Sequence, residues 1–415
     1  MKTVPAIARR VAVWGTVAIA VVAPTQYGIR ILDRATLSVA DPLVWLAFAA
    51  WLVYCFGERP AAESEPAGSL WRARWRAISP PLLHALLVAA AALSVPRAGD
   101  RLLAAKDLFQ WIEYLLMAFV LFSGVCGLLV PRRRIAWLLL GMAAAVVGLG
   151  LVHYWTPSVP DFGVRATFGN RNVFGGYLAM MLPLAFGLLL YDPHRLRRAG
   201  YGLLIVAGAS VLLAGGSFLA IALAFAALAL TRGTRTFLVL LAVALLAAGA
   251  VRPLLPRDNA EILHRSVMLC EPDDESMMHE RYAEWQAALF MIGDQPWRGV
   301  GLGNYQRNIG LWFGSLPDKA EPAEPDSQNL YLVVGSTIGL PGALCLVALL
   351  IQAMIGALKS FSQAHDPVER GIALGAFGAM LGFAVNSFWS PLLVRGIGLP
   401  LMLVLALAGG RGRPK

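Results

Sequence analysis

The sequence has little charge and little cysteine. Charged residues make up 14% of the 415 residues, whereas 58% are hydrophobic and the mean hydropathy is +0.64. Soluble globular proteins carry about 25% charged residues. The composition therefore excludes a soluble enzyme, a disordered chain and a coiled coil, and it predicts a multi-spanning membrane protein. Four cysteines are too few for a disulfide framework. No secretory cleavage site is evident, so Val11–Ala23 is interpreted as part of a retained first span.

Apolar runs separated by polar breaks predict an all-α, polytopic fold with about twelve transmembrane helices, each of roughly 20 residues. The predicted spans are Val11–Ile31, Pro42–Phe56, Pro81–Val95, Leu108–Val130, Ile135–Trp155, Val173–Tyr191, Tyr201–Ala214, Phe218–Leu230, Phe237–Val251, Asn329–Leu358, Gly371–Trp389 and Ile397–Ala408.

Basic residues in the short loops predict the orientation of the chain. Clusters such as Arg72–Arg76, Arg132–Arg134 and Arg195–Arg198 all fall on the side that carries both termini. Positively charged short loops face the cytoplasm, so we expect cytoplasmic N- and C-termini. The net charge of +10 thus reflects orientation, and no nucleic-acid partner is expected.

These spans predict three parts: a bundle of nine spans over 1–251, a large outer loop over 252–328, and three further spans with a cytoplasmic tail over 329–415. Loops of that length are uncommon without a function.

Within the large loop the sequence predicts a soluble helix. Acidic residues from Asp273 to Glu275 suit its first turn, and Gly293 and Pro296 are typical stop signals. Between them, apolar side chains recur at helical spacing and predict one apolar face. They are Tyr282, Trp285, Leu289 and Ile292.

Arginines gather on the predicted outer side. Arg165 and Arg171 precede the sixth span, and Arg281 lies early in the loop helix. Guanidinium groups pair bidentately with phosphate, so two of them could hold a lipid diphosphate. Salt bridges with Glu280 or Glu284 are the alternative interpretation.

Two other loop motifs have structural interpretations. Gly299–Asn304 is glycine-rich but follows a helix and lacks a Walker lysine, so we expect a tight turn against the bundle. Asp326–Asn329 predicts a helix cap at Asp326 or Ser327, polar chemistry at the membrane surface, or both. The spacing of His264 and His279 fits no zinc pattern, and no metal site is expected.

Three stretches together resemble the O-antigen ligase and polymerase superfamily of bacterial envelope glycosyltransferases. They are Arg165–Asn172 with the following Phe174–Leu178, Arg281–Trp285 with Gly299–Tyr305, and Gln328–Leu332 with Gly339–Gly342. The resemblance covers roughly residues 160–390.

The resemblance implies a metal-independent enzyme without a cofactor. The donor is a glycan on undecaprenyl diphosphate at the periplasmic face of the bacterial inner membrane, and the acceptor is a sugar hydroxyl, on lipid A core for a ligase or on another lipid-linked repeat for a polymerase. Arginines stabilise the departing diphosphate. The implied catalytic residues are Arg281, Gln328 and Asp326. The implied substrate-binding residues are Arg165, Arg171, Asn170, Asn172, Trp285, Tyr305 and Asn329.

The sequence departs from the family pattern at two places. Gln328 occupies the position of the histidine that the family uses to activate the acceptor, and glutamine takes no proton at neutral pH. Gly215–Phe218 lacks an arginine that many members carry. By position, Asp326, Glu280 or His279 is a candidate base, or solvent takes the proton.

Four functions remain open at this stage. A ligase is slightly favoured over a polymerase because the chain is short and has one large loop. A protein O-oligosaccharyltransferase usually has a longer chain. A lipid-linked glycan transporter would place charges in mid-span, where this sequence has mainly Glu113.

The departure at position 328 gives a first test. We expect Gln328→His to raise glycan transfer because histidine can accept the hydroxyl proton, and Gln328→Ala to lower it. Transfer is measured on membranes that contain equal amounts of each variant. A silent Gln328→Ala variant would mean that this residue only shapes the helix start.

Overall fold

The structure is a computed structural model, and it describes residues 3–25, 28–32, 35–57, 78, 80–155, 166–212, 218–235, 238, 275–313 and 328–409. Within these ranges the chain consists of helices, the turns and loops that connect them, and one short hairpin. The elements of the first half are α1 (Thr3–Val22), β1 (Gly28–Leu32), β2 (Ala35–Ser38), α2 (Ala40–Gly57), α4 (Leu82–Ser94), η1 (Val95–Arg97), α5 (Arg101–Ile112), η2 (Glu113–Ala118), α6 (Phe119–Gly124), η3 (Val125–Leu129) and α7 (Arg132–Trp155). Those of the second half are α8 (Arg171–Tyr191), α9 (Arg195–Leu212), α10 (Phe218–Leu230), α13 (Glu275–Asp294), α14 (Tyr305–Phe313), α15 (Leu330–Gln363), α16 (Pro367–Asn386) and α17 (Gly398–Ala408).

The helical membrane class is confirmed. Seven helices among the described residues are long and apolar enough to cross a membrane, and three shorter apolar helices accompany them. The run from α5 to η3 forms one of the seven, with π-helical turns at η2 and η3. Every predicted span overlaps a described helix except Phe237–Val251, of which the structure describes only residue 238. The total of about twelve spans stays a prediction.

The first predicted span was wrong at its C-terminal end. Helix α1 ends at Val22, and the chain then forms the antiparallel hairpin β1–β2, in which Gly28 faces Ser38. Pro24 has no backbone N–H to continue the helix. The Thr25 hydroxyl donates to the Val22 carbonyl (2.7 Å) and so satisfies one of the last helical acceptors. The fold is therefore helical with one small hairpin, not purely α.

Helices α8 and α16 form the tightly packed centre of the bundle. Side chains from Phe174 to Leu188 of α8 are buried. A Cβ on Gly187 would lie 2.4 Å from the Gly375 backbone nitrogen, so the two backbones touch. Such close approach through small residues is how membrane helices pack without a hydrophobic driving force between them.

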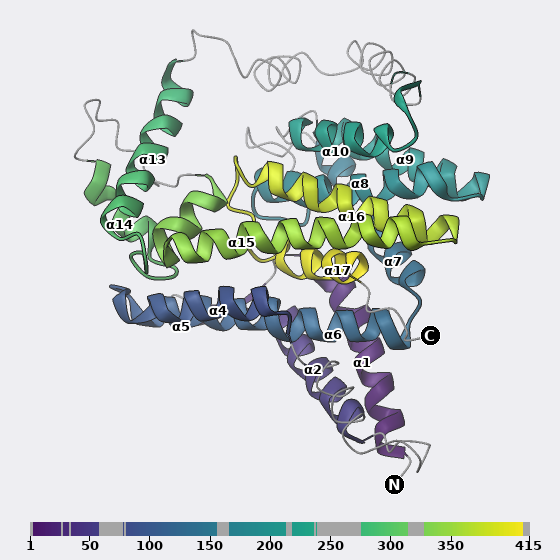
Figure 1. The fold of residues 1–415 in the computed structure, drawn as a ribbon, viewed down its shortest axis with the longest axis horizontal. Helices are drawn as coiled ribbons and strands as arrows, with labels where there is room; N and C mark the ends of the chain where they lie inside the picture. The colour runs from purple at the N-terminus through teal and green to yellow at the C-terminus, as the bar shows by residue number, and fades with distance from the viewer. Residues whose placement is uncertain are drawn as a thin grey trace.

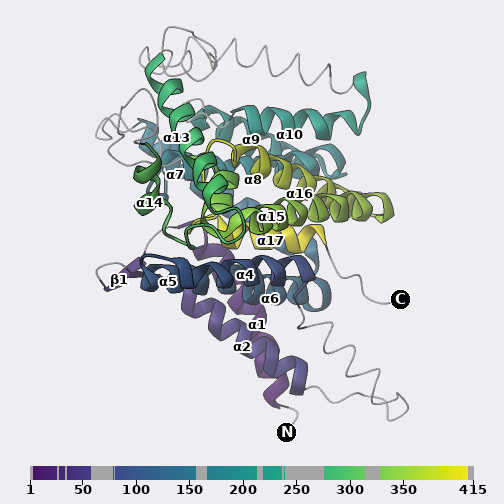
Figure 2. The same ribbon diagram turned by 60° about the vertical axis from the view of Figure 1, so that its left-hand side comes forward.

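The helices divide into a main bundle and a tilted pair. Helices α4, α15 and α16 run side by side, whereas α1 and α2 pack on each other at a steep angle to them (Figures 1 and 2). Helices α13 and α14 and the start of α15 gather at one end of the bundle, on the left of Figure 1. We call this end the α13 end.

The glycine contact between α8 and α16 gives a stability prediction. Gly187→Ala should destabilise the protein by about 1–3 kcal/mol, the usual cost of overpacking. Gly148→Ala is the matched control, because a Cβ there meets nothing within 4 Å. Thermal unfolding in detergent measures both, and equal midpoints for the two variants would contradict the packing described here.

Candidate functional site

A glycine turn fixes the loop to the bundle at the α13 end. Gly299, Gly301 and Gly303 have φ values of 60°, 103° and 71°, a region that favours glycine. The Val300 and Gly301 N–H groups donate to the carbonyls of Ser336 and Thr337, both at 2.9 Å. The predicted tight turn against the bundle is confirmed.

Helix α15 bends where the turn meets it. Gly339 has φ 82° and ψ 172°, and Pro341 follows within the same helix. A Cβ on Gly339 would lie 2.5 Å from the Trp297 carbonyl carbon, and one on Gly299 would lie 2.4 Å from the Ser336 carbonyl oxygen. The turn and the kink therefore interlock, and each requires glycine.

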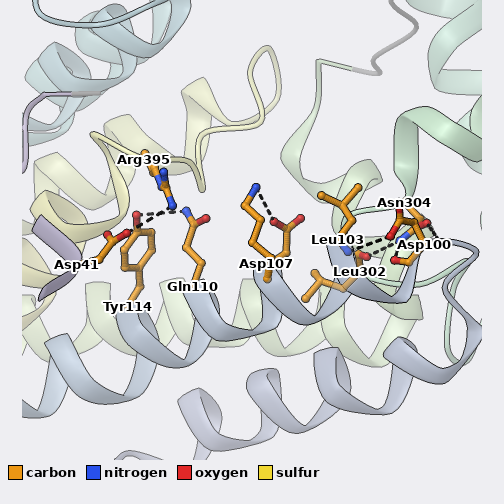
Figure 3. A network of polar contacts seen from close by, with 10 residues as sticks. Asp41, Asp100, Leu103, Asp107, Gln110, Tyr114, Leu302, Asn304 and Arg395 are labelled. Carbon is orange, nitrogen blue, oxygen red and sulfur yellow. Dashed lines mark hydrogen bonds and ion pairs between the residues drawn. The ribbon is translucent and has the colours of Figure 1, made fainter. Parts of the chain in front are cut away.

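Asn304 ties the same turn to the start of α5. Its side chain is fully buried; Oδ1 accepts from the Asp100 N–H (2.8 Å), and Nδ2 donates to the carbonyls of Asp100 (3.2 Å) and Leu302 (2.9 Å). The Leu302 N–H donates to the Ser94 hydroxyl (3.1 Å). The loop, α4 and α5 are thereby held in one arrangement (Figure 3).

A row of polar side chains follows one face of α5 and η2 from this point. Asp100, Asp107, Gln110 and Tyr114 recur at helical spacing and lie along the helix in Figure 3. Lys106 Nζ lies 3.6 Å from Asp107 Oδ1, and Gln110 donates to the Tyr114 hydroxyl (3.2 Å). We call these residues the polar row. Carboxylate, amide and ammonium groups of this kind bind hydroxyl-rich molecules through hydrogen bonds.

The inner end of the polar row meets a buried charge cluster. Arg395 Nη2 lies 3.4 Å from Asp41 Oδ2, and the Ser38 N–H also donates to that oxygen (2.8 Å). Glu113 is 2% exposed and interacts with both Asp41 and Arg395. Charges buried in a membrane protein are costly and usually have a functional reason.

Several residues predicted from the sequence have structural roles. Asn329 caps α15, since its Oδ1 accepts from the N–H groups of Tyr331 (3.0 Å) and Leu332 (3.2 Å). The predicted caps Asp326 and Ser327 were therefore wrong: the helix starts at Leu330, too late for either. Asn170 likewise caps α8 and accepts from the Asn172 N–H (2.7 Å).

Helix α13 confirms the predicted loop helix but buries a different face. Ala287, Ala288 and Met291 are fully buried, whereas Leu289 is 56% exposed. The small alanines let α13 approach α15 closely, which a pattern of large apolar residues did not reveal. Trp285 is half-buried on this helix.

The structure describes some of the remaining predicted site residues, and others lie outside the described ranges. Tyr305 is buried against α13, Gln328 precedes the Asn329 cap with φ 47°, and Arg171 is exposed. Arg165 and Asp326 lie outside the described residues. The structure describes the backbone of Arg281 on α13 but not its side chain. The predicted site residues are thus not seen as one assembled centre.

Sequence reasoning missed Asp41, Asp107 and Arg395. Arg395 follows the eleventh predicted span and Asp41 precedes the second, so only the three-dimensional fold brings them together. The helical spacing from Asp100 to Tyr114 was a signal that could have been found.

The fold and these contacts define a helical membrane protein with a polar assembly and a docked loop at the α13 end. Residues 209–347 match the family model described as O-antigen ligase. The match includes α13, the glycine turn and the start of α15, and it confirms the resemblance to the O-antigen ligase and polymerase superfamily. The stretch Arg165–Asn172 lies outside the match. No curated protein matches the chain.

The buried cluster predicts a strong effect of charge removal. Arg395→Gln should destabilise the protein by about 3–5 kcal/mol, because it leaves the buried Asp41 charge unpaired. Arg307→Gln is the control: Arg307, which pairs with Asp100 (3.0 Å), has a 59% exposed side chain, and ion pairs at the surface contribute only about 0–1 kcal/mol.

Thermal unfolding measures both variants, together with the single variant Asp41→Asn and the double variant Asp41→Asn/Arg395→Gln. The double variant should recover part of the loss, since neither charge then remains unpaired. A double variant as unstable as the sum of its single variants would refute the coupling between Asp41 and Arg395.

Proposed function

We propose that this protein transfers a glycan from undecaprenyl diphosphate to an acceptor sugar hydroxyl at the periplasmic face of the inner membrane. The observation that carries this proposal is the O-antigen ligase match over 209–347, which includes the Arg281 helix and Gln328. The termini then lie in the cytoplasm, as the basic loops predict.

The chemistry needs a cation for the leaving group more than it needs a strong base. The glycosidic bond to the diphosphate breaks while the acceptor oxygen attacks the sugar, and the diphosphate gains negative charge. A guanidinium at Arg281 would stabilise that charge, with Arg165 as the second choice. Gln328 would orient the acceptor hydroxyl, and Asp326 would accept the proton that the hydroxyl loses.

The polar row suits the acceptor sugar better than the diphosphate. The two cations nearest the row already face carboxylates, since Lys106 lies 3.6 Å from Asp107 and Arg395 lies 3.4 Å from Asp41, so their charge is already compensated. Hydroxyl groups, in contrast, donate well to carboxylates. Asp107 keeps 27% of its side chain exposed and lies against Gly303 of the glycine turn. We place the acceptor along this row.

A lipid A core acceptor, and hence a ligase-like activity, is our preferred reading. The single large loop predicted over 252–328 supports it over a polymerase. A lipid-linked glycan transporter is the alternative function, and Glu113 near the middle of the span Arg101–Leu129 is the feature that would support it.

Substitution of Arg281 tests this function. Arg281→Ala should reduce glycan transfer at least about 100-fold, the usual loss when a transition-state charge stabiliser is removed. Arg281→Lys should retain part of the activity because it keeps the charge but loses bidentate pairing. Transfer from a lipid-linked donor is measured in proteoliposomes.

Arg101→Ala is the control, because Arg101 is exposed at the start of α5 and has no role in the proposed reaction. All variants are compared at equal insertion and equal thermal midpoint. Full activity in Arg281→Ala would contradict the phosphate-stabilising role of Arg281.

A further inference from the structure

Two arginines share one pocket at the α13 end. The pocket has a volume of about 260 Å³ and is lined by Arg97, Asp294, Gln295, Pro296, Trp297 and Arg298. Among the described residues neither Arg97 nor Arg298 forms an ion pair, in contrast to Arg307 and Arg395.

The polar neighbours in the pocket do not neutralise these arginines. Arg97 Nη1 donates to the neutral Gln295 Oε1 (3.2 Å). The Asp294 carboxylate instead accepts from Trp312 Nε1 (2.6 Å). The lining therefore carries two positive charges and one negative charge, which favours an anionic ligand.

The pocket lies beside Leu340, the residue at which the exposed apolar face of α15 begins. The Leu340 N–H donates to the Pro296 carbonyl (2.7 Å), which fixes the turn that carries Trp297 and Arg298 to the start of the straight part of α15. From Leu340 to Leu358 this helix rises about 28 Å, close to the hydrocarbon thickness of about 30 Å. The pocket thus lies at the membrane interface.

Two apolar rows lead away from the pocket along neighbouring helices. On α15 the exposed side chains recur at helical spacing, namely Leu340, Leu344, Val347, Ile351, Ile355 and Leu358. On α4, which packs against α15 and is followed by Arg97 in η1, Leu82, Leu86 and Leu93 are exposed. Both rows can contact lipid chains.

Trp297 is exposed in the way expected of a side chain that anchors a protein at the membrane surface. It is 76% exposed although it is large and apolar. Tryptophan is enriched where a membrane meets water, because its ring is apolar and its N–H is polar. A soluble anion would gain nothing from this side chain or from the apolar rows.

We propose that Arg97 and Arg298 bind the phosphate group of a membrane lipid, whose hydrocarbon chains lie on the exposed faces of α15 and α4. Both guanidinium groups donate to the phosphate oxygens, and Trp297 covers the junction between headgroup and chain. The ligand class is a lipid-borne phosphate, from either a phospholipid or a polyprenyl diphosphate.

Binding to the purified full chain in a zwitterionic detergent tests the site. The probes are dioctanoyl phosphatidic acid, farnesyl diphosphate and inorganic phosphate, and dissociation constants are measured by calorimetry. The double variant Arg97→Gln/Arg298→Gln should bind the lipid-borne phosphates about 10- to 100-fold more weakly, the loss expected for charge-assisted hydrogen bonds. The tighter of the two lipid probes identifies the source of the phosphate.

The charge-matched control is Arg101→Gln/Arg307→Gln, which removes two exposed arginines outside the pocket at the same end. It should change neither dissociation constant by more than about twofold. Equal weakening in both double variants would mean unspecific attraction and would overturn the site. So would inorganic phosphate binding as tightly as the lipids, or a pocket variant with unchanged affinity.

The unfolding midpoint of each variant shows that the comparison is made on folded protein. Binding is measured without glycan transfer, so a chain that transfers no glycan can still bind lipid at Arg97 and Arg298. Loss of transfer in Arg281→Ala with unchanged lipid binding would separate the two sites.

Discussion

The arrangement of the α13 end depends on the contact between the glycine turn and the kink in α15. Without a side chain at Gly299 and Gly339, the two backbones approach closely enough for Ser336 and Thr337 to accept the hydrogen bonds of the turn. This contact sets the direction of α13, which precedes the turn, and of α14, which follows it. It also places Trp297 and Arg298 beside the apolar surface of α15. The position of the described part of the loop, from α13 to α14, follows from this one interlock.

Buried charged side chains of the bundle lie close to partners of opposite charge. The Asp41–Arg395 pair joins α2 to the loop before α17, and Glu113 lies beside both in the π-helical turn η2. A π-helical turn shifts the side chains that follow it on the helix, and such turns often occur at functional sites. Desolvation of these groups is expensive, so they stabilise the fold only as a set. A membrane enzyme can accept this cost where a polar substrate must be held against the lipid phase.

The sequence predicted most of the helices, but it did not predict which side chains come together at the site. Long apolar runs predict spans because the bilayer allows few alternatives, and the glycines from Gly299 to Gly303 predicted their turn. The apolar face predicted for α13 is not the face that this helix buries, because Ala287 and Ala288, not the large side chains, make its contact. The contact between Asp41 and Arg395 joins two distant segments, and no local pattern in one sequence records such a contact. Arg281, the most specific prediction from the family motif, stays a prediction.

Glycan transfer by this chain is a proposal, and the pools of lipid-linked glycan in a host that lacks this gene are the quantity to measure. We expect long glycans to accumulate on undecaprenyl diphosphate while the lipid A core stays bare. Accumulation of single repeat units would instead identify a polymerase within the same superfamily. Unchanged pools of both donor and acceptor would contradict glycan transfer by this protein.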